Sequence, residues 1–434
     1  MRRTLWATLA LCLLLAMGAQ TATAAQTTTL PEAGQSFEKY PALKDVYKDY
    51  FLVGTVDKFD LEVRRDLIAY NFNTITNENI MKPTNQQRTK GKFTFDGTRF
   101  LLSQARDLIP GVKVIGHTLA WHEQTPFWMW NHPGYDSSVA LENLTAHIEG
   151  VLGEFGAGLY SVDVVNEAMK DNIADPNDWK NALRSDEGWY LALGWEWVEL
   201  AFLAAAKVVD DNGWDCKLYY NDYNTEVPSK ATAIHEMVRD INERYAGQRP
   251  NGKQLIEGVG MQTHLNSATD MDSVEASVQL FTDLPGVSIS FTEIDIRYPV
   301  SGGSLTDAQA VAQAEQYAKL FVILKKYAAG RAGTSGNPQV IERVTFWGVD
   351  DAMSWKKDEK PLPWGAVSDG QILAKEALLG VLWPEEYLGI PPVTKGVPSG
   401  GLDIGITHIA AAAAVLFALT GSGVFAVLES RKRK

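Results

Sequence analysis

Two glutamates of this chain come at or near the end of apolar runs. The run VDVV at 162–165 stops at Asn166 and Glu167, and the run VSISF at 287–291 is followed closely by Glu293. Burying polar and ionised groups is costly, so such strand ends suggest chemistry. Two carboxyl groups held roughly 5 Å apart can serve as the acid/base and the nucleophile of retaining glycoside hydrolysis. We therefore predict that Glu167 and Glu293 face each other.

Other chemistries find little support in the sequence. It contains no HExxH or CxxC spacing, only 7 histidines, and no glycine-rich phosphate loop of specific spacing. We expect neither a metal nor a cofactor. The formal net charge of −13, without a basic stripe, argues against a nucleic-acid partner.

The elements that must position the two glutamates are short apolar runs alternating with longer helical patterns. The expected strands are 51–56, 72–77, 112–117, 160–166, 216–222, 255–262, 287–293 and 343–349. Near-continuous apolar character is typical of parallel strands covered on both faces. Residues 195–213 have the pattern of an amphipathic helix that stops at Asn212-Gly213. The chain is thus predicted to be an α/β protein, a (β/α)8 TIM barrel.

A barrel of this kind places its active site at the carboxyl ends of the strands. Polar side chains collect at those predicted ends, far more than stability requires. They are Asn77, Glu78, Asn79, His117, Asn166, Glu167, Asn221, Asp222, Gln262, His264 and Glu293, joined by Trp347. The prediction is one site on one face of the barrel.

Seven motifs, in order along residues 45–390, resemble those of glycoside hydrolase family 10 endo-β-1,4-xylanases. They are FNTITNENIMK (72–82), GHTLAWHEQTPFW (116–128), DVVNEA (163–168), YYNDYN (219–224), GVGMQTH (258–264), FTEIDI (291–296) and TFWGVDDAMSW (345–355). Each motif alone is moderately specific, whereas seven in the family's order are very specific. The resemblance implies hydrolysis of internal β-1,4-xylosidic bonds of xylan with retention of configuration, by a monomer without a cofactor.

The resemblance also implies residue roles. Glu167 would be the general acid/base and Glu293 the nucleophile. Catalytic support would come from Asn166, His264, Asp295 and Gln262. Xylan and xylo-oligosaccharides would be bound by Glu78, Asn79, Lys82, His117, Trp121, Tyr223, Trp347 and Trp355, the last two tryptophans forming a wall that favours xylose over glucose.

The sequence departs from the family pattern at three places. Val162 and Pro83 stand where the family commonly has tryptophan, and Ile115 stands where it commonly has arginine. Pro83 calls the neighbouring sugar contacts of Lys82 into question. Two other readings stay open: a related retaining β-1,4-glucanase or cellulase, and a non-catalytic, membrane-tethered barrel that binds polysaccharide.

The two ends of the chain indicate the secretory pathway. Arg2 and Arg3, a short apolar run and the small residues 22–24 form a predicted signal peptide, and a long apolar stretch near the other end precedes RKRK. The predicted segments are 1–25 signal peptide, 26–44 short N-terminal segment, 45–390 catalytic barrel, 391–403 Pro/Gly/Ser linker, 404–428 transmembrane helix or GPI-anchor signal, and 429–434 basic cytosolic tail. We expect the barrel on the extracellular face of the plasma membrane, or released from it.

Two further residues bear on that environment. Cys12 falls in the signal peptide, so Cys216 is expected to be a lone, buried cysteine without a disulfide partner. Asn143, in the sequon Asn143-Leu144-Thr145, is predicted to carry an N-linked glycan.

Overall fold

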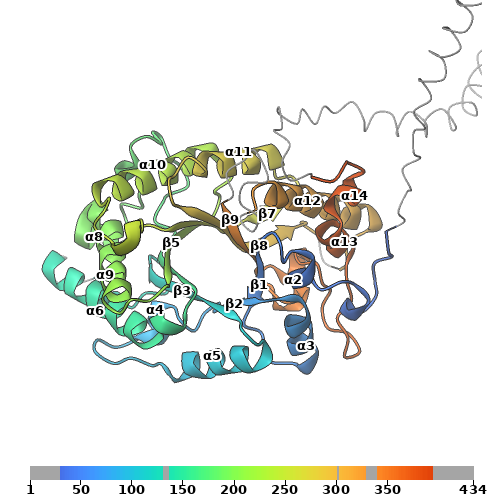
Figure 1. The fold of residues 1–434 in the computed structure, drawn as a ribbon, viewed down its shortest axis with the longest axis horizontal. Coiled ribbons are helices and arrows are strands. Elements are labelled where there is room, and N and C mark those ends of the chain that lie inside the picture. The colour runs from blue at the N-terminus through green and yellow to red at the C-terminus, as the bar shows by residue number, and fades with distance from the viewer. Residues whose placement is uncertain (1–29, 131–135, 301–302, 329–339, 394–434) are drawn as a thin grey trace, which may run out of the picture.

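The computed structural model describes residues 30–130, 136–300, 303–328 and 340–393 (Figure 1). Within them the strands belong to one 9-stranded sheet in which every strand pairing is parallel. The strands are β1 (Leu52–Val56), β2 (Thr74–Thr76), β3 (Lys113–Trp121), β4 (Ser161–Asn166), β5 (Lys217–Asp222), β6 (Gly258–Met261), β7 (His264–Asn266), β8 (Ser288–Arg297) and β9 (Ile341–Phe346).

The sheet closes on itself because β6 also pairs with β8, with Gly258 opposite Ser288. The closed ring contains β1 to β6, β8 and β9, which correspond to the eight predicted strands, so the predicted (β/α)8 barrel is confirmed. The additional strand β7 continues from β6 and pairs with the far end of β8. Strand β3 extends beyond the predicted end at residue 117 and carries Trp121.

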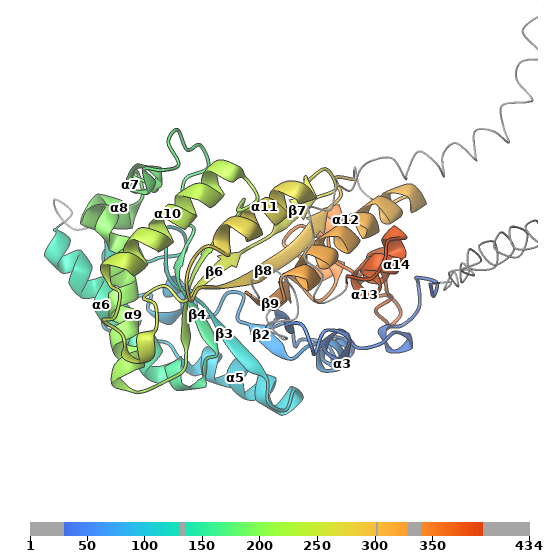
Figure 2. The ribbon, with the colours of Figure 1, turned by 45° about the horizontal axis from the view of Figure 1, so that its top comes forward.

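Helices surround the ring of strands (Figures 1 and 2). The α-helices are α2 (Leu43–Val46), α3 (Glu62–Asn71), α4 (Pro83–Gln86), α5 (Asp96–Leu108), α6 (Ser137–Phe155), α7 (Trp179–Ala182), α8 (Gly188–Leu193), α9 (Trp197–Asp211), α10 (Pro228–Arg244), α11 (Met271–Phe281), α12 (Asp307–Lys326), α13 (Glu376–Leu382) and α14 (Pro384–Leu388). Short 3-10 turns are η1 (Phe37–Lys39), η2 (Phe127–Met129), η3 (Gly156–Gly158), η4 (Gly194–Glu196), η5 (Pro250–Gly252), η7 (Asp351–Met353) and η8 (Lys357–Glu359).

The apolar character of the strands follows from burial on both sides. All residues of β4 are buried, because one set of its side chains fills the barrel and the other packs under the helices. The predicted helix at 195–213 is observed as α9. The helix ends just before Gly213, which adopts a positive φ of 65°. Cys216 is buried as expected, with 1% of its surface exposed.

The predicted terminal segments at 1–25 and 404–434 lie outside the described residues. Among the residues that the structure does describe, none of the helices combines the length and apolarity needed to cross a membrane.

Candidate active site

Glu167 occupies a constrained position at the end of β4. Its φ of 57° lies in the left-handed region, which is unfavourable for a residue with a side chain. Two hydrogen bonds hold this backbone in place: Glu167 N donates to Asn221 O at 2.8 Å, and Arg184 Nε donates to Glu167 O at 3.0 Å. The chain therefore turns out of the strand at this residue and presents its carboxyl group to the neighbouring strand ends.

The carboxyl group of Glu167 meets two donors. Gln262 Nε2 lies 2.8 Å from Oε1, and Trp121 Nε1 lies 2.9 Å from Oε2. Burial is the largest effect and raises the pKa of Glu167, and the nearby charges of Asp222 and Glu293 raise it further. The hydrogen bonds from Gln262 and Trp121 act in the opposite direction and lower the pKa. The net effect is an elevated pKa, as a group that must donate a proton near neutral pH requires.

Glu293, on β8, lies in surroundings that lower its pKa, in contrast to those of Glu167. Asn221 Nδ2 donates to its Oε1 at 2.9 Å, and His264 Nε2 lies 3.1 Å from its Oε2. Burial alone would raise the pKa of Glu293, but the bond from His264, the attraction of His117 and His264, and the bond from Asn221 outweigh it and lower the pKa. A carboxylate that stays ionised inside the protein is suited to nucleophilic attack.

His264 is oriented from its other ring nitrogen. Its Nδ1 lies 3.0 Å from Asp295 Oδ2, and β7 brings the two residues opposite each other in register with β8. Thr263, with a φ of 66°, makes the turn between β6 and β7. Burial disfavours the charged imidazole, but Asp295 and Glu293 raise the pKa of His264 to about 10. The histidine is therefore a cation that faces the nucleophile.

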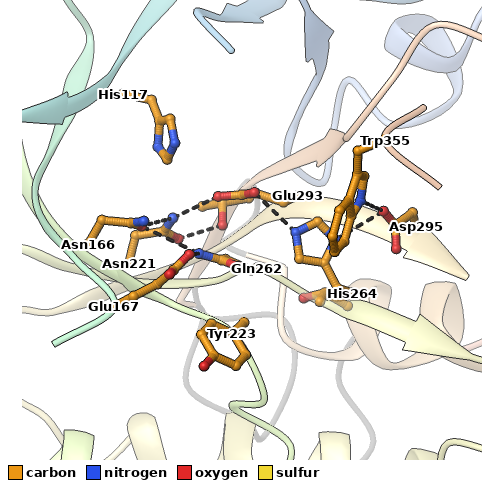
Figure 3. A network of polar contacts seen from close by, with 12 residues as sticks. His117, Asn166, Glu167, Asn221, Tyr223, Gln262, His264, Glu293, Asp295 and Trp355 are labelled. Carbon is orange, nitrogen blue, oxygen red and sulfur yellow. Dashed lines mark hydrogen bonds and ion pairs between the residues drawn. The ribbon is translucent and has the colours of Figure 1, made fainter. Parts of the chain in front are cut away.

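The two glutamates are connected by a continuous set of side-chain amides (Figure 3). Asn221 Nδ2 contacts both Glu293 Oε1 and Asn166 Oδ1, each at 2.9 Å. Gln262 Nε2 then approaches Asn166 Oδ1 at 3.4 Å and Glu167 Oε1 at 2.8 Å. This arrangement fixes the acid and the nucleophile relative to each other.

The residues expected to bind sugar after β2 lie together with Trp121. Lys82 Nζ donates to Asn79 Oδ1 at 3.0 Å and lies 4.9 Å from the centre of the Trp121 ring. Burial lowers the pKa of Lys82, although the charges of nearby Glu293, Glu78 and Glu167 act in the other direction. Glu78 forms an ion pair with Lys58.

The other expected sugar contacts are divided between two regions. His117 on β3 is held by Asp163, with Nδ1 and Oδ2 at 2.9 Å, and its ring centre lies 5.4 Å from that of Trp347 in a T-shaped arrangement. Trp355, after η7, is 54% exposed and lies against His264.

Tyr223 follows β5 on the same face as Glu167 (Figure 3). Its hydroxyl donates to Asp171 Oδ2 at 2.8 Å, and Lys230 Nζ lies 3.7 Å from the ring centre. Arg184, which holds the backbone of Glu167, also donates to the Tyr223 hydroxyl.

The glycan predicted on Asn143 stays a prediction, and the packing of the folded chain disfavours it. Asn143 lies within α6, is only 2% exposed, and donates through Nδ2 to the carbonyl oxygens of Met129 and Trp128. A glycan would need that same nitrogen and has no room at a buried helix face. The sequon is local, whereas its burial depends on packing.

Local sequence patterns assign no specific role to three residues of the site. Asn221 is marked in the sequence only as a polar residue at the end of a strand. Asp163 lies inside an apolar run, where a charge is itself a sign of a partner. Arg184 lies in a loop, and no local pattern links it to Glu167.

Comparison with known families agrees with this geometry. Residues 42–382 match the model of glycosyl hydrolase family 10. This chain belongs to that family. The match covers the barrel and all the site residues described above.

Several curated relatives are xylanases, and one, from Acetivibrio thermocellus, is named an exoglucanase. The family 10 chain is 35% identical over 372 residues to endo-1,4-beta-xylanase A of Thermotoga maritima, which covers 82% of this chain and 32% of that protein. It is 31% identical over 327 residues to an endo-1,4-beta-xylanase of Geobacillus stearothermophilus, covering 73% of this chain and 89% of that one. The chain thus spans about a third of the length of the Thermotoga maritima relative.

Solved structures of similar fold include ligand complexes. An intracellular xylanase from Thermoanaerobacterium saccharolyticum, bound to xylotriose, has a TM-score of 0.66 and 30% identity, covering 79% of this chain and 98% of that one. A GH10 xylanase with a bacterial Ig-like domain, from termite gut, has a TM-score of 0.70 and 30% identity, covering 82% of this chain and 80% of that one.

The structure accommodates the three departures from the family pattern. Val162 is fully buried and packs close to Gly116, at a point where a larger side chain would meet the neighbouring strand. Ile115 is likewise buried. Pro83 is the first residue of α4, where its fixed φ suits a helix start, and Lys82 keeps its contacts directly before it.

Proposed function

We propose that this chain is an endo-1,4-β-xylanase that hydrolyses internal bonds of xylan with retention of configuration. The observation that carries the proposal is the pair Glu167 and Glu293, joined by Asn166, Asn221 and Gln262 and shifted in pKa in opposite directions. The family membership and the xylanase relatives support the substrate class.

The first half of the reaction forms a covalent intermediate. The Glu293 carboxylate attacks the anomeric carbon while Glu167 gives its proton to the glycosidic oxygen, so that the C–O bond breaks and the aglycone leaves as an alcohol. His264 and Asn221 occupy the two oxygens of Glu293, which keeps it ionised and aimed. The resemblance to family 10 enzymes implies that Asn166 binds the 2-hydroxyl group of the sugar during this step.

The second half returns the enzyme to its starting state. Glu167, now a carboxylate, takes a proton from water as that water attacks the anomeric carbon and displaces Glu293. Two inversions give net retention. The protons balance because Glu167 loses one in the first step and regains one in the second.

Xylose rather than glucose as the repeating unit is supported by the tryptophans and by similar proteins. Trp347 directly follows β9 and lies beside His117, and Trp355 follows η7 and lies beside His264. Solved relatives hold xylotriose and xylotetraose. These are properties of the relatives, and their transfer to this chain is part of the proposal.

The test is product release by the full-length chain from β-1,4-xylan and, in parallel, from carboxymethyl-cellulose. Short xylo-oligosaccharides from xylan, lost in Glu293→Ala, are expected. Release mainly from cellulose would replace the substrate with a β-1,4-glucan. Binding of xylan without any release would leave a polysaccharide-binding barrel instead of an enzyme.

We further propose that the barrel acts outside the cell, attached to its surface. The support is the sequence at the two ends, with a charged and apolar leader before residue 25 and the apolar stretch 404–428 followed by basic residues. Cell fractionation tests this: the chain should sediment with membranes and be reached by added protease. Recovery only in the medium would contradict a retained anchor.

A further inference from the structure

Trp355 combines an exposed ring face with a buried polar contact. The residue follows η7 and is 54% exposed. Its indole Nε1 nevertheless donates to Asp295 Oδ2 at 2.7 Å, and Asp295 is fully buried (Figure 3). A tryptophan that served only as a flat surface for sugar would not need this hydrogen bond.

The oxygen that receives this bond is the one that orients the histidine. Asp295 Oδ2 also lies 3.0 Å from His264 Nδ1, and His264 Nε2 lies 3.1 Å from Glu293 Oε2. The other oxygen, Asp295 Oδ1, has no hydrogen-bond partner within the described parts of the chain. Among the described residues, Trp355 and His264 are therefore the two side-chain donors to the buried carboxylate of Asp295, which orients His264 toward Glu293.

We propose that Trp355 is a positioning residue for the nucleophile, acting through its indole N–H on Asp295 and thence through His264 on Glu293. This inference rests on the proposed function, since Glu293 is taken as the nucleophile. It adds to the role of the ring as a wall, because the wall requires the aromatic face and the proposed role requires the N–H.

The expected effect follows from charge. A hydrogen-bond donor partly neutralises the negative charge of Asp295. The positive charge of His264 is then less compensated by Asp295 and stabilises the Glu293 carboxylate more strongly. Without the N–H, Asp295 binds the imidazolium more strongly and the site becomes more negative. Glu293 then takes up a proton at a higher pH.

The segment that carries Trp355 is fixed from two sides. Buried Arg64 on α3 donates through Nε to Asp350 Oδ2 at 2.5 Å, and Asp350 Oδ1 accepts from Ala352 N at 2.9 Å to begin η7. The next residue, Asp351, pairs with Lys375 at 3.0 Å. These contacts hold the indole where it meets Asp295, as a positioning role requires.

Substrate would reach this network through the exposed ring. A sugar lying against Trp355 removes water from the indole, which is the exposed side of the Nε1–Asp295 bond, and a hydrogen bond shielded from water is electrostatically stronger. Occupancy of the site would then strengthen the effect of Trp355 on Asp295 and Glu293 as the reaction begins.

The test compares Trp355→Phe, which keeps an aromatic face and loses the N–H, with Trp355→Ala, which loses both. We measure kcat and KM against pH for the full-length chain on an aryl β-xylobioside. Trp355→Phe should show kcat reduced about tenfold, KM changed less than about twofold, and the acid limb of kcat/KM moved up by roughly half a unit to one unit. Trp355→Ala should show the same limb shift with a raised KM.

A matched control uses another tryptophan of the same segment. Trp364 is fully buried and its Nε1 has no hydrogen-bond partner among the described residues, so Trp364→Phe also removes an indole N–H but should leave the acid limb in place. An acid limb unchanged in Trp355→Phe, with only KM altered, would reduce Trp355 to a wall and overturn the proposal.

A second readout does not depend on xylan cleavage. With ¹⁵N-labelled histidine, the His264 ring resonances should shift in Trp355→Phe and remain unchanged in Trp364→Phe. If the wild-type chain hydrolyses no xylan, the proposed function fails, while this spectrum still tests the link from Trp355 to His264. Identical His264 resonances in wild type and Trp355→Phe would overturn the link itself.

Discussion

Asn221 Nδ2 lies 2.9 Å from Glu293 Oε1 and 2.9 Å from Asn166 Oδ1. One amide nitrogen therefore touches both the nucleophile and the residue that precedes the acid. Asn221 itself is held, because Thr292 Oγ1 donates to its Oδ1 at 2.6 Å. Asn221 thus sets the spacing of the two halves of the site.

Replacing Asn221 with alanine should lower kcat strongly. Glu293 would lose a charge-assisted hydrogen bond, worth about 1.5–3 kcal/mol, which corresponds to a loss of roughly 10- to 160-fold in kcat. Because this bond also lowers the pKa of Glu293, the acid limb should move to higher pH. Steady-state kinetics on an aryl β-xylobioside measures both effects.

Asn242 provides the matched control. It is a buried asparagine of α10 that bonds the backbone of Ile256. Asn242→Ala should lower the free energy of unfolding and leave kcat and the acid limb unchanged. Equal kinetic losses in the two variants would mean that Asn221 acts only through stability.

Replacing Gln262 with leucine should move the alkaline limb of the pH profile upward. Activity requires Glu167 to be protonated, so it falls as pH rises through the elevated pKa of Glu167. The hydrogen bond from Gln262 opposes that elevation. Its removal raises the pKa further and extends activity to higher pH, which a kcat/KM profile detects.

Gln316→Leu is the comparison for this change. Gln316 lies on α12 and donates to the backbone of Ser267 and Thr269, away from Glu167. We expect an unchanged alkaline limb in this variant. An alkaline limb that stays in place in Gln262→Leu as well would contradict the assignment of Glu167.

The stability of the folded chain should depend on His264 at alkaline pH. The folded-state pKa of about 10 lies above the ordinary value of 6.5, so the stabilisation is fully present below 6.5 and is lost as pH rises toward 10. Urea denaturation of wild type and His264→Ala at both ends of this interval measures it. The difference between the two proteins should shrink by roughly 3–5 kcal/mol across the interval; a constant difference would mean that His264 is neutral.

Arg64→Met should destabilise the fold. Arg64 is 5% exposed and its partner Asp350 is fully buried, so the substitution leaves a buried carboxylate without its main counter-charge. We expect a loss of about 3–5 kcal/mol in the free energy of unfolding. Lys207→Ala, which breaks the exposed pair of Lys207 with Asp211, should cause no measurable change. Similar results for the two variants would show that the buried pair contributes little.

Secretion from a eukaryotic host should yield folded protein without a glycan on Asn143, because that side chain is buried and bonded to the backbone of η2. Intact mass before and after treatment with an amidase that releases N-linked glycans decides this. A mass decrease in active, folded protein would contradict the observed packing of α6.

The succession of strands and helices in the barrel and the two catalytic glutamates could be predicted from the sequence, because both depend on local patterns. An apolar run such as 162–165 forms a strand wherever both its faces are covered, and Glu167, two residues after the run, lies at the carboxyl end of that strand. The spacing of Glu293 and Asp295 likewise places both side chains on one face of β8.

Tertiary structure alone decided which polar groups meet. The bond of Asn221 to Glu293, of Arg184 to the Glu167 carbonyl and of Trp355 to Asp295 each join segments far apart in the chain. Such contacts depend on barrel closure, strand register and loop path, none of which leaves a local pattern. The same holds for Asn143: the sequon is three adjacent residues, but its burial results from how α6 packs against η2.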